Sequence, residues 1–130
     1  MTATSDCRQL VSLFLVARQD PDANAMDLMD PAFTFESPLM RFEDRDAYLS
    51  SYRGFQRLVR GTRMISELYG PEDATLLYDL ETETPAGVQR TAEHFQIIGG
   101  RVRSILLLFD SAPWRPIFEG LGPDRDMPSS

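Results

Sequence analysis

The chain has 130 residues, with 20 acidic and 13 basic side chains and a formal net charge of −7 at pH 7. This charge argues against binding to a nucleic-acid backbone, which requires a basic surface, and no stretch approaches the roughly 20 apolar residues of a membrane helix. The single cysteine, Cys7, excludes an internal disulfide, and the N-terminus lacks the basic and apolar segments of a secretory signal. We therefore expect a cytoplasmic protein that binds neither nucleic acid nor membranes.

The length and composition predict one domain over residues 1–119. Hydrophobic residues make up 42% of the chain and charged residues 25%, which is typical of a globular protein with one core and room for a pocket. The last segment, residues 120–130 (GLGPDRDMPSS), is polar and rich in proline and glycine. We expect this tail to be disordered.

The first half of the chain predicts helices around one short strand. A long helix at residues 5–19, capped by Ser5 or Asp6, has an apolar stripe of Leu10, Leu13, Phe14 and Ala17. A short helix at 21–28 and a strand at 33–37 are expected to follow, and Pro38 ends the strand. A third helix begins at Asp44 and runs to about residue 59, with one face formed by Tyr48, Tyr52, Phe55 and Val59.

From residue 62 onward the periodicity changes from helical to extended. Strands are predicted at 62–69, 74–83, 89–98 and 101–110, separated by turn residues. The pair Gly99-Gly100 is a two-residue hairpin turn of the kind that accepts positive φ. Helices followed by an antiparallel meander predict an α+β fold with helices on one face of a curved sheet.

The last predicted strand, RVRSILLLFD, is apolar on both faces. Strand alternation places Val102, Ser104, Leu106 and Leu108 on one face, and Ile105, Leu107 and Phe109 on the other. Because the helices can cover only one face, the other needs a different cover. We expect a homodimer formed through this outer sheet face.

The order of these elements resembles the nuclear-transport-factor-like superfamily, which includes ketosteroid isomerase, scytalone dehydratase and the SnoaL-like polyketide cyclases. The resemblance covers nearly all of residues 5–115 and rests on the segments FTFESP, YGPEDATLLYDLETE and TAEHFQIIGGRVRSILLLFDSAPW. It implies a cone fold, in which a curved antiparallel sheet wraps around the long N-terminal helix and opens at one end to an apolar pocket. Many members pair through the convex sheet face, which agrees with the expected homodimer.

The resemblance implies that the catalytic residues of ketosteroid isomerase are largely missing here. That enzyme uses a tyrosine on the first helix, an aspartate before a proline, and a second, protonated acid on a central strand. The corresponding positions fall on Leu13, Ser37 and Glu93. A serine is not a proton acceptor near pH 7 without a partner base, so steroid-type isomerisation is not expected.

The same correspondence implies a mostly apolar set of pocket residues, as is usual for ligand pockets. The set is Leu13, Ser37, Tyr52, Phe55, Tyr78, Leu80, Glu93, Phe95, Ile105 and Phe109. Any one of them could instead pack the core. No cofactor is expected, and no metal site is expected either, because the chain has one histidine, one cysteine and no clustered ligand spacing.

Glu93 is the most informative of these positions. Its neighbours on the inner side of the predicted strand are Thr91, Phe95 and Ile97, so an inward carboxylate is costly unless it is paired or protonated. A protonated Glu93 could act as an acid or donate a hydrogen bond to a ligand carbonyl. The alternative is a structural salt bridge to an arginine on a neighbouring strand, such as Arg63.

His94, the only histidine, is predicted to point outward, opposite to Glu93. There Asp79 of the preceding strand could meet it across the ladder. Such a pair is more typical of structure than of catalysis, although the inverse register would place both side chains in the pocket. Asp110 ends the last strand. The resemblance implies proton transfer, because an acid near this strand has that role in some cyclase-like relatives, and the alternative is that Asp110 caps the turn before Pro113.

Two functions remain open at this point. The first is binding of a small, apolar, oxygenated ligand, with possible turnover by a cofactor-free lyase, isomerase or cyclase that uses Glu93 with Tyr52 or Tyr78. The second is a non-catalytic dimeric interaction module whose cone is filled by its own side chains. An open, partly polar cavity favours the first, and a cone filled by Phe14, Tyr52, Phe55 and Phe109 favours the second.

Overall fold

The structure, a computed structural model, describes residues 3–120. Its elements in chain order are α1 (Ala3–Ala17), η1 (Ala25–Leu28), β1 (Met29–Glu36), β2 (Arg41–Phe42), α2 (Arg45–Gln56), β3 (Val59–Tyr69), β4 (Asp73–Thr82), β5 (Val88–Ile98), β6 (Arg101–Leu108) and α3 (Arg115–Gly120). The predicted tail at 120–130 lies outside the described residues, apart from Gly120, where α3 ends.

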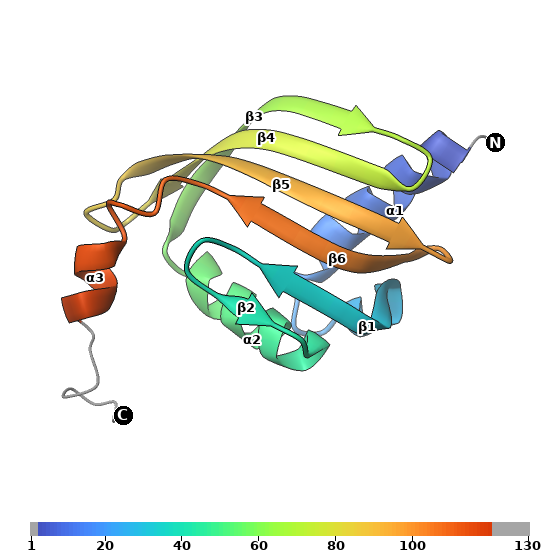
Figure 1. Cartoon of the computed structure of the whole chain (residues 1–130), viewed down its shortest axis with the longest axis horizontal. Helices are drawn as coiled ribbons and strands as arrows, with labels where there is room; N and C mark the ends of the chain where they lie inside the picture. Colours follow the sequence, from blue (N-terminus) through green and yellow to red (C-terminus); the bar gives the residue numbers. More distant parts are fainter. Residues whose placement is uncertain (1–2, 121–130) are drawn as a thin grey trace.

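The strands form one six-stranded sheet in the order β2-β1-β6-β5-β4-β3. Strands β3 to β6 are the predicted antiparallel meander, whereas β1 runs parallel to β6 and antiparallel to β2. The helix α1 contacts β3 and β4 and passes behind the sheet in Figure 1, while α2 contacts β1 and β2. The expected α+β fold, a curved sheet wrapped around a long N-terminal helix, is confirmed.

The segment between α1 and α2 departs most from the prediction. The helix expected at 21–28 is only the 3-10 turn η1, because the Asp20 side chain accepts a hydrogen bond from the Asp22 amide at 2.9 Å and closes a turn there. The strand expected at 33–37 begins earlier, since Met29 already pairs with Val102 of β6. The short elements β2 and α3 were not predicted.

The buried stripe of α1 is rotated from the predicted one. Its members Cys7, Val11 and Phe14 are at most 2% exposed, whereas Leu13 is 54% exposed. Phe14 packs edge to face against Phe95 of β5, with ring centroids 6.2 Å apart. The apolar run in this helix allowed several stripes, and packing against the sheet selects one of them.

Two turn signals in the sequence are confirmed. Gly99 and Gly100 have φ angles of 58° and 75° in the turn between β5 and β6, a left-handed conformation that glycine adopts without steric cost. Asp44 is the N-cap of α2, and its carboxylate accepts from the Asp46 amide at 3.2 Å. These local devices set where the meander turns and where α2 begins.

A bulge alters the alternation of β6. The register against β5 shifts between Gln96 and Ile97, and Val102 is consequently fully buried rather than on the outer face. Beyond the bulge the predicted alternation holds, because Leu106 and Leu108 are 39% and 52% exposed. A bulge inserts one residue into a strand and so reverses the faces on one side of it.

Candidate functional site

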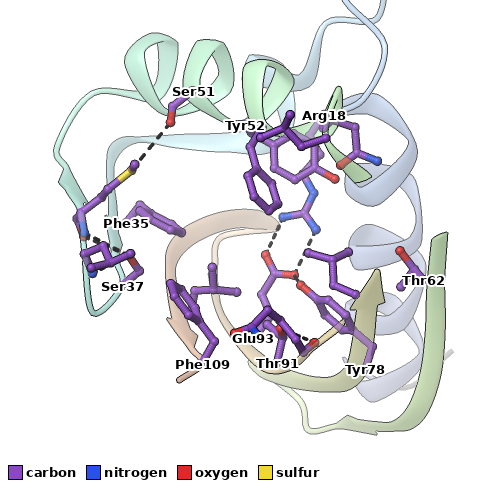
Figure 2. A pocket seen from close by; sticks show the side chains of 18 of the residues that line it. Arg18, Phe35, Ser37, Ser51, Tyr52, Thr62, Tyr78, Thr91, Glu93 and Phe109 are labelled. Atoms are coloured by element: carbon purple, nitrogen blue, oxygen red, sulfur yellow. Dashed lines mark hydrogen bonds and ion pairs between the residues drawn. The ribbon is translucent and has the colours of Figure 1, made fainter. Parts of the chain in front are cut away.

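A cavity of about 360 Å³ opens on the inner side of the sheet, next to α2. Figure 2 shows its side chains converging from α2 and from several strands. Apolar and aromatic residues dominate its wall, and among the described residues that line it only Arg18 and Glu93 carry a charge. Both volume and lining are typical of small-molecule pockets.

Seven of the ten predicted pocket residues line this cavity. They are Ser37, Tyr52, Phe55, Tyr78, Leu80, Glu93 and Phe109. Strand alternation placed Tyr78, Leu80 and Glu93 on the inner face, because one face of each strand is buried, whereas Tyr52 and Phe55 come from α2. Whether they bind a ligand stays a prediction.

The other three predicted residues do not line the cavity. Leu13 lies on the exposed side of α1, so the prediction for it is wrong. Phe95 and Ile105 pair across β5 and β6 and are 0% and 1% exposed within the closed core, next to Phe14. The alternation of a strand predicts which face a side chain lies on, but it does not predict how deep in the cone the side chain lies. Where Phe95 and Ile105 lie, α1 fills the space inside the sheet.

Glu93 forms a buried ion pair with Arg18, the residue that follows α1. Arg18 Nη1 lies 2.5 Å from Glu93 Oε2, and Nη2 lies 3.0 Å from Oε1. The two residues are only 5% and 2% exposed. This two-pronged geometry compensates charges that would be costly to bury alone.

Three tyrosines surround the ion pair, and with Arg18 and Glu93 they form what we call the Arg18–Glu93 cluster. The Tyr78 hydroxyl donates to Glu93 Oε1 at 3.0 Å, and Arg18 Nη1 donates to the Tyr48 hydroxyl oxygen, also at 3.0 Å. The guanidinium carbon of Arg18 lies 4.3 Å from the ring centroid of Tyr52, within the range of a cation–π contact. Figure 2 shows Glu93 between Arg18 and Tyr78, with Tyr52 beside the guanidinium.

Arg18, Tyr48 and Tyr78 keep their usual protonation states around neutral pH. Burial raises the pKa of Tyr78 far above its usual value, and the adjacent Glu93 raises it further. Burial likewise raises the pKa of Tyr48, although Arg18 opposes the shift. Burial alone would lower the pKa of Arg18, but the attraction and hydrogen bonding of Glu93, together with the contributions of Tyr48 and Tyr52, outweigh it and the pKa rises. Tyr48 and Tyr78 are therefore neutral and Arg18 is a cation.

The sequence prediction named Arg63 as a possible partner of Glu93, and this was wrong. Arg63 pairs with Asp79 at 2.8 Å on the outer side of the sheet, and the partner of Glu93 is Arg18 instead. A signal for it existed, because Arg18 continues the i, i+4, i+7, i+11 stripe of Cys7, Val11 and Phe14. A charged residue on a buried stripe requires a buried partner.

His94 points outward, as predicted, but it does not meet Asp79. In the observed register His94 pairs with Thr75, whose hydroxyl lies 2.7 Å from Nδ1, and Asp79 pairs with Arg90. Asp79 accepts hydrogen bonds from Arg90 and Arg63, and these lower its pKa to about 2. The register between the two strands, which alternation cannot supply, decided these partners.

This surface network predicts a pH dependence of stability. The pKa of Asp79 is lowered to about 2 in the folded protein. The stabilisation by its carboxylate is therefore fully present above about pH 4, the pKa of an aspartate in the unfolded chain, and it is lost as the pH falls through about 2. We expect Asp79→Asn to lower the thermal midpoint by no more than a few degrees at pH 7. The difference in thermal midpoint between this variant and the natural protein should decrease toward pH 2, as measured by thermal unfolding followed by circular dichroism. A gap that stays constant over this range would contradict the assignment.

Two polar residues at strand ends cap turns. Ser37 Oγ accepts from the amides of Leu39 and Met40 at 3.2 and 3.1 Å. Asp110 Oδ1 accepts from the Ala112 amide at 3.0 Å, and its side chain is exposed. Both side chains therefore accept hydrogen bonds from backbone amides in a turn. For Asp110 this agrees with the alternative of turn capping rather than proton transfer.

Trp114 forms part of the cavity wall. Its ring packs against Phe55 and Phe109, with centroids 5.7 and 6.4 Å apart. Its Nε1 donates to Gln89 Oε1 at 3.1 Å. These contacts fix the segment after β6 against α2 and β5.

Within residues 3–120, no three or more potential metal ligands gather in one group. No helix in this part of the chain is both long and apolar enough to cross a bilayer.

The comparisons with known proteins find likeness in structure only. No protein-family model matches the sequence, and no curated protein matches it. Similar solved structures include a protein from Kribbella flavida, with 24% identity and a TM-score of 0.72 over 87% of this chain and 93% of that one. An NTF2-like protein of unknown function from Cytophaga hutchinsonii has 20% identity and a TM-score of 0.65 over 86% and 94%. A protein from Sinorhizobium meliloti, described as a proposed polyketide cyclase, has 15% identity and a TM-score of 0.66 over 80% and 97%.

Proposed function

We propose, from the nuclear-transport-factor-like fold of this chain, that the protein binds a small, neutral, mostly apolar molecule that contains oxygen. The observation that carries this proposal is the open cavity of about 360 Å³, apolar over most of its wall and polar at the Arg18–Glu93 cluster. A cavity of this size and character suits a compact cyclic molecule.

The charge balance supports a neutral ligand. Arg18 and Glu93 are the charged residues of the described cavity wall, and they neutralise each other through two contacts. A ligand carboxylate or phosphate would be desolvated without a free counter-charge, which is costly in an apolar environment. The polar end of the cavity can still bind oxygen through hydrogen bonds.

The alternative of a cone filled by its own side chains has less support. Of the aromatic residues expected to fill it, Phe14 lies in the closed core, while Tyr52, Phe55 and Phe109 form walls around open space. An open space of this kind reduces the stabilisation that side-chain packing gives to the free protein. Binding of a ligand would restore those contacts.

Binding has more support than turnover. Glu93, the residue expected to act as acid or base, already accepts three hydrogen bonds from Arg18 and Tyr78. It is therefore not the hydrogen-bond donor considered from the sequence, and proton transfer by Glu93 would require this ion pair to open. A lyase, isomerase or cyclase reaction thus has no specific observation in its favour.

The test compares two ligands of the same bicyclic shape, 2-acetylnaphthalene and 2-naphthoate, by equilibrium dialysis. The neutral ketone is expected to bind, and the carboxylate should bind at least about tenfold more weakly. Leu80→Trp, which fills the cavity from β4, should weaken the binding of the ketone at least about tenfold. The control Val16→Trp lies on an exposed part of α1 and should leave it unchanged. Tighter binding of the carboxylate would overturn the proposal.

We further propose that a second copy of the chain covers the outer sheet face. Leu68, Leu77, Leu106 and Leu108 share this face by register, and Leu68 is 64% exposed. Exposed apolar side chains that gather on one sheet face are typical of a protein–protein contact. A self-associating sheet face would bring the same patch from both copies together around a two-fold axis.

A further inference from the structure

The hydroxyl group of Tyr48 is a buried donor without an acceptor among the residues that the structure describes. Arg18 Nη1 lies 3.0 Å from its oxygen, and a guanidinium can only donate. The Tyr48 oxygen must therefore accept this hydrogen bond, and its own hydrogen is left for another partner. Because Tyr48 is 3% exposed, an unmet donor there is costly.

The position of this hydroxyl is set by packing. The ring of Tyr48 contacts Phe33 and Phe35, with centroids 5.1 and 4.9 Å apart, and Arg18 holds the oxygen at the other end. Tyr48 also lines the cavity. A rigid ring that lines the cavity and carries a hydroxyl group is well placed to contact a ligand there.

At the polar end of the cavity, hydrogen-bond donors outnumber the acceptors that are free to bind them. Within residues 3–120, Arg18 Nε is also a buried donor without a partner. The nearby carboxylate of Glu93 already accepts three hydrogen bonds. A ligand that supplies an acceptor therefore complements this end better than one that supplies a donor.

We propose that Tyr48 donates a hydrogen bond to an acceptor oxygen of the bound molecule, such as a ketone or quinone carbonyl. This inference rests on the proposed function and identifies the chemical group of the ligand that the polar end of the cavity binds. Donation from Arg18 polarises the Tyr48 hydroxyl and strengthens it as a donor. The raised pKa of Tyr48, caused mainly by burial, keeps the hydroxyl protonated at neutral pH.

The experiment combines two ligands with three variants in equilibrium dialysis. 2-Acetylnaphthalene carries the carbonyl, and 2-ethylnaphthalene has nearly the same shape without it. Tyr48→Phe should weaken binding of the ketone about tenfold, the loss expected for one hydrogen bond, and change binding of the hydrocarbon less than about twofold. Tyr69→Phe, which removes a hydroxyl bonded to Glu67 outside the cavity, should change neither. Tyr52→Phe tests the neighbouring hydroxyl on α2.

An infrared spectrum of the bound ketone separates a direct contact from a structural effect. The carbonyl stretch should lie at lower frequency in the natural protein than in Tyr48→Phe, because a hydrogen bond weakens the C=O bond. An unshifted stretch, equal losses for both ligands, or a loss confined to Tyr52→Phe would overturn the role of Tyr48 while leaving the ligand-binding function in place. If the natural protein bound neither ligand, the proposed function would fail, and the inference with it.

Discussion

Replacing Arg18 by methionine is expected to lower the free energy of unfolding by about 3–5 kcal/mol, the cost of breaking a buried ion pair from one side. The substitution leaves the Glu93 carboxylate, 2% exposed, in an apolar surrounding without its counter-charge. It also removes the hydrogen bond that Arg18 donates to Tyr48. Urea denaturation at neutral pH, followed by circular dichroism, measures the change.

A matched control uses the same substitution in a surface pair. Arg63 lies 2.8 Å from Asp79, but its side chain is 70% exposed, so Arg63→Met should cost no more than about 1 kcal/mol. The double variant Arg18→Met with Glu93→Leu should recover most of the stability lost in the single variant, because no buried charge remains unpaired. A double variant less stable than Arg18→Met would contradict this account of the cluster.

Leu106→Arg is expected to convert a dimer into monomers. In a two-fold contact through the outer sheet face, each copy would bury one arginine without a partner, and association should weaken at least about 100-fold. Sedimentation velocity at matched concentrations gives the oligomeric state. Leu13→Arg is the control, because Leu13 is also exposed, at 54%, but lies on α1 away from this face.

Two results would contradict the proposed contact. A natural protein that sediments as a monomer would exclude the homodimer. A Leu106→Arg variant that remains dimeric would place the contact on another surface. The second result would leave the cavity and its proposed ligand unaffected, because the inner face of the sheet contributes the cavity wall.

The sequence determined the parts of this protein that depend on near neighbours in the chain. Alternation of period two predicted strands β3 to β6 and directed Glu93 inward and His94 outward, because one face of each strand must be buried. Asp44 and the Gly99-Gly100 pair marked a helix start and a hairpin through local backbone chemistry. The order of these elements predicted an α+β fold with helices on one face of a curved sheet, and the cone shape was implied by the resemblance.

Tertiary structure alone decided which distant residues meet. Arg18 and Glu93 lie 75 positions apart, and their contact depends on how α1 is rotated against the sheet. The same rotation exposes Leu13 and buries Val11. A single bulge turned Val102 inward. The strand register pairs Asp79 with Arg90 rather than with His94. These choices depend on the packing energy of the whole core, which no local pattern contains.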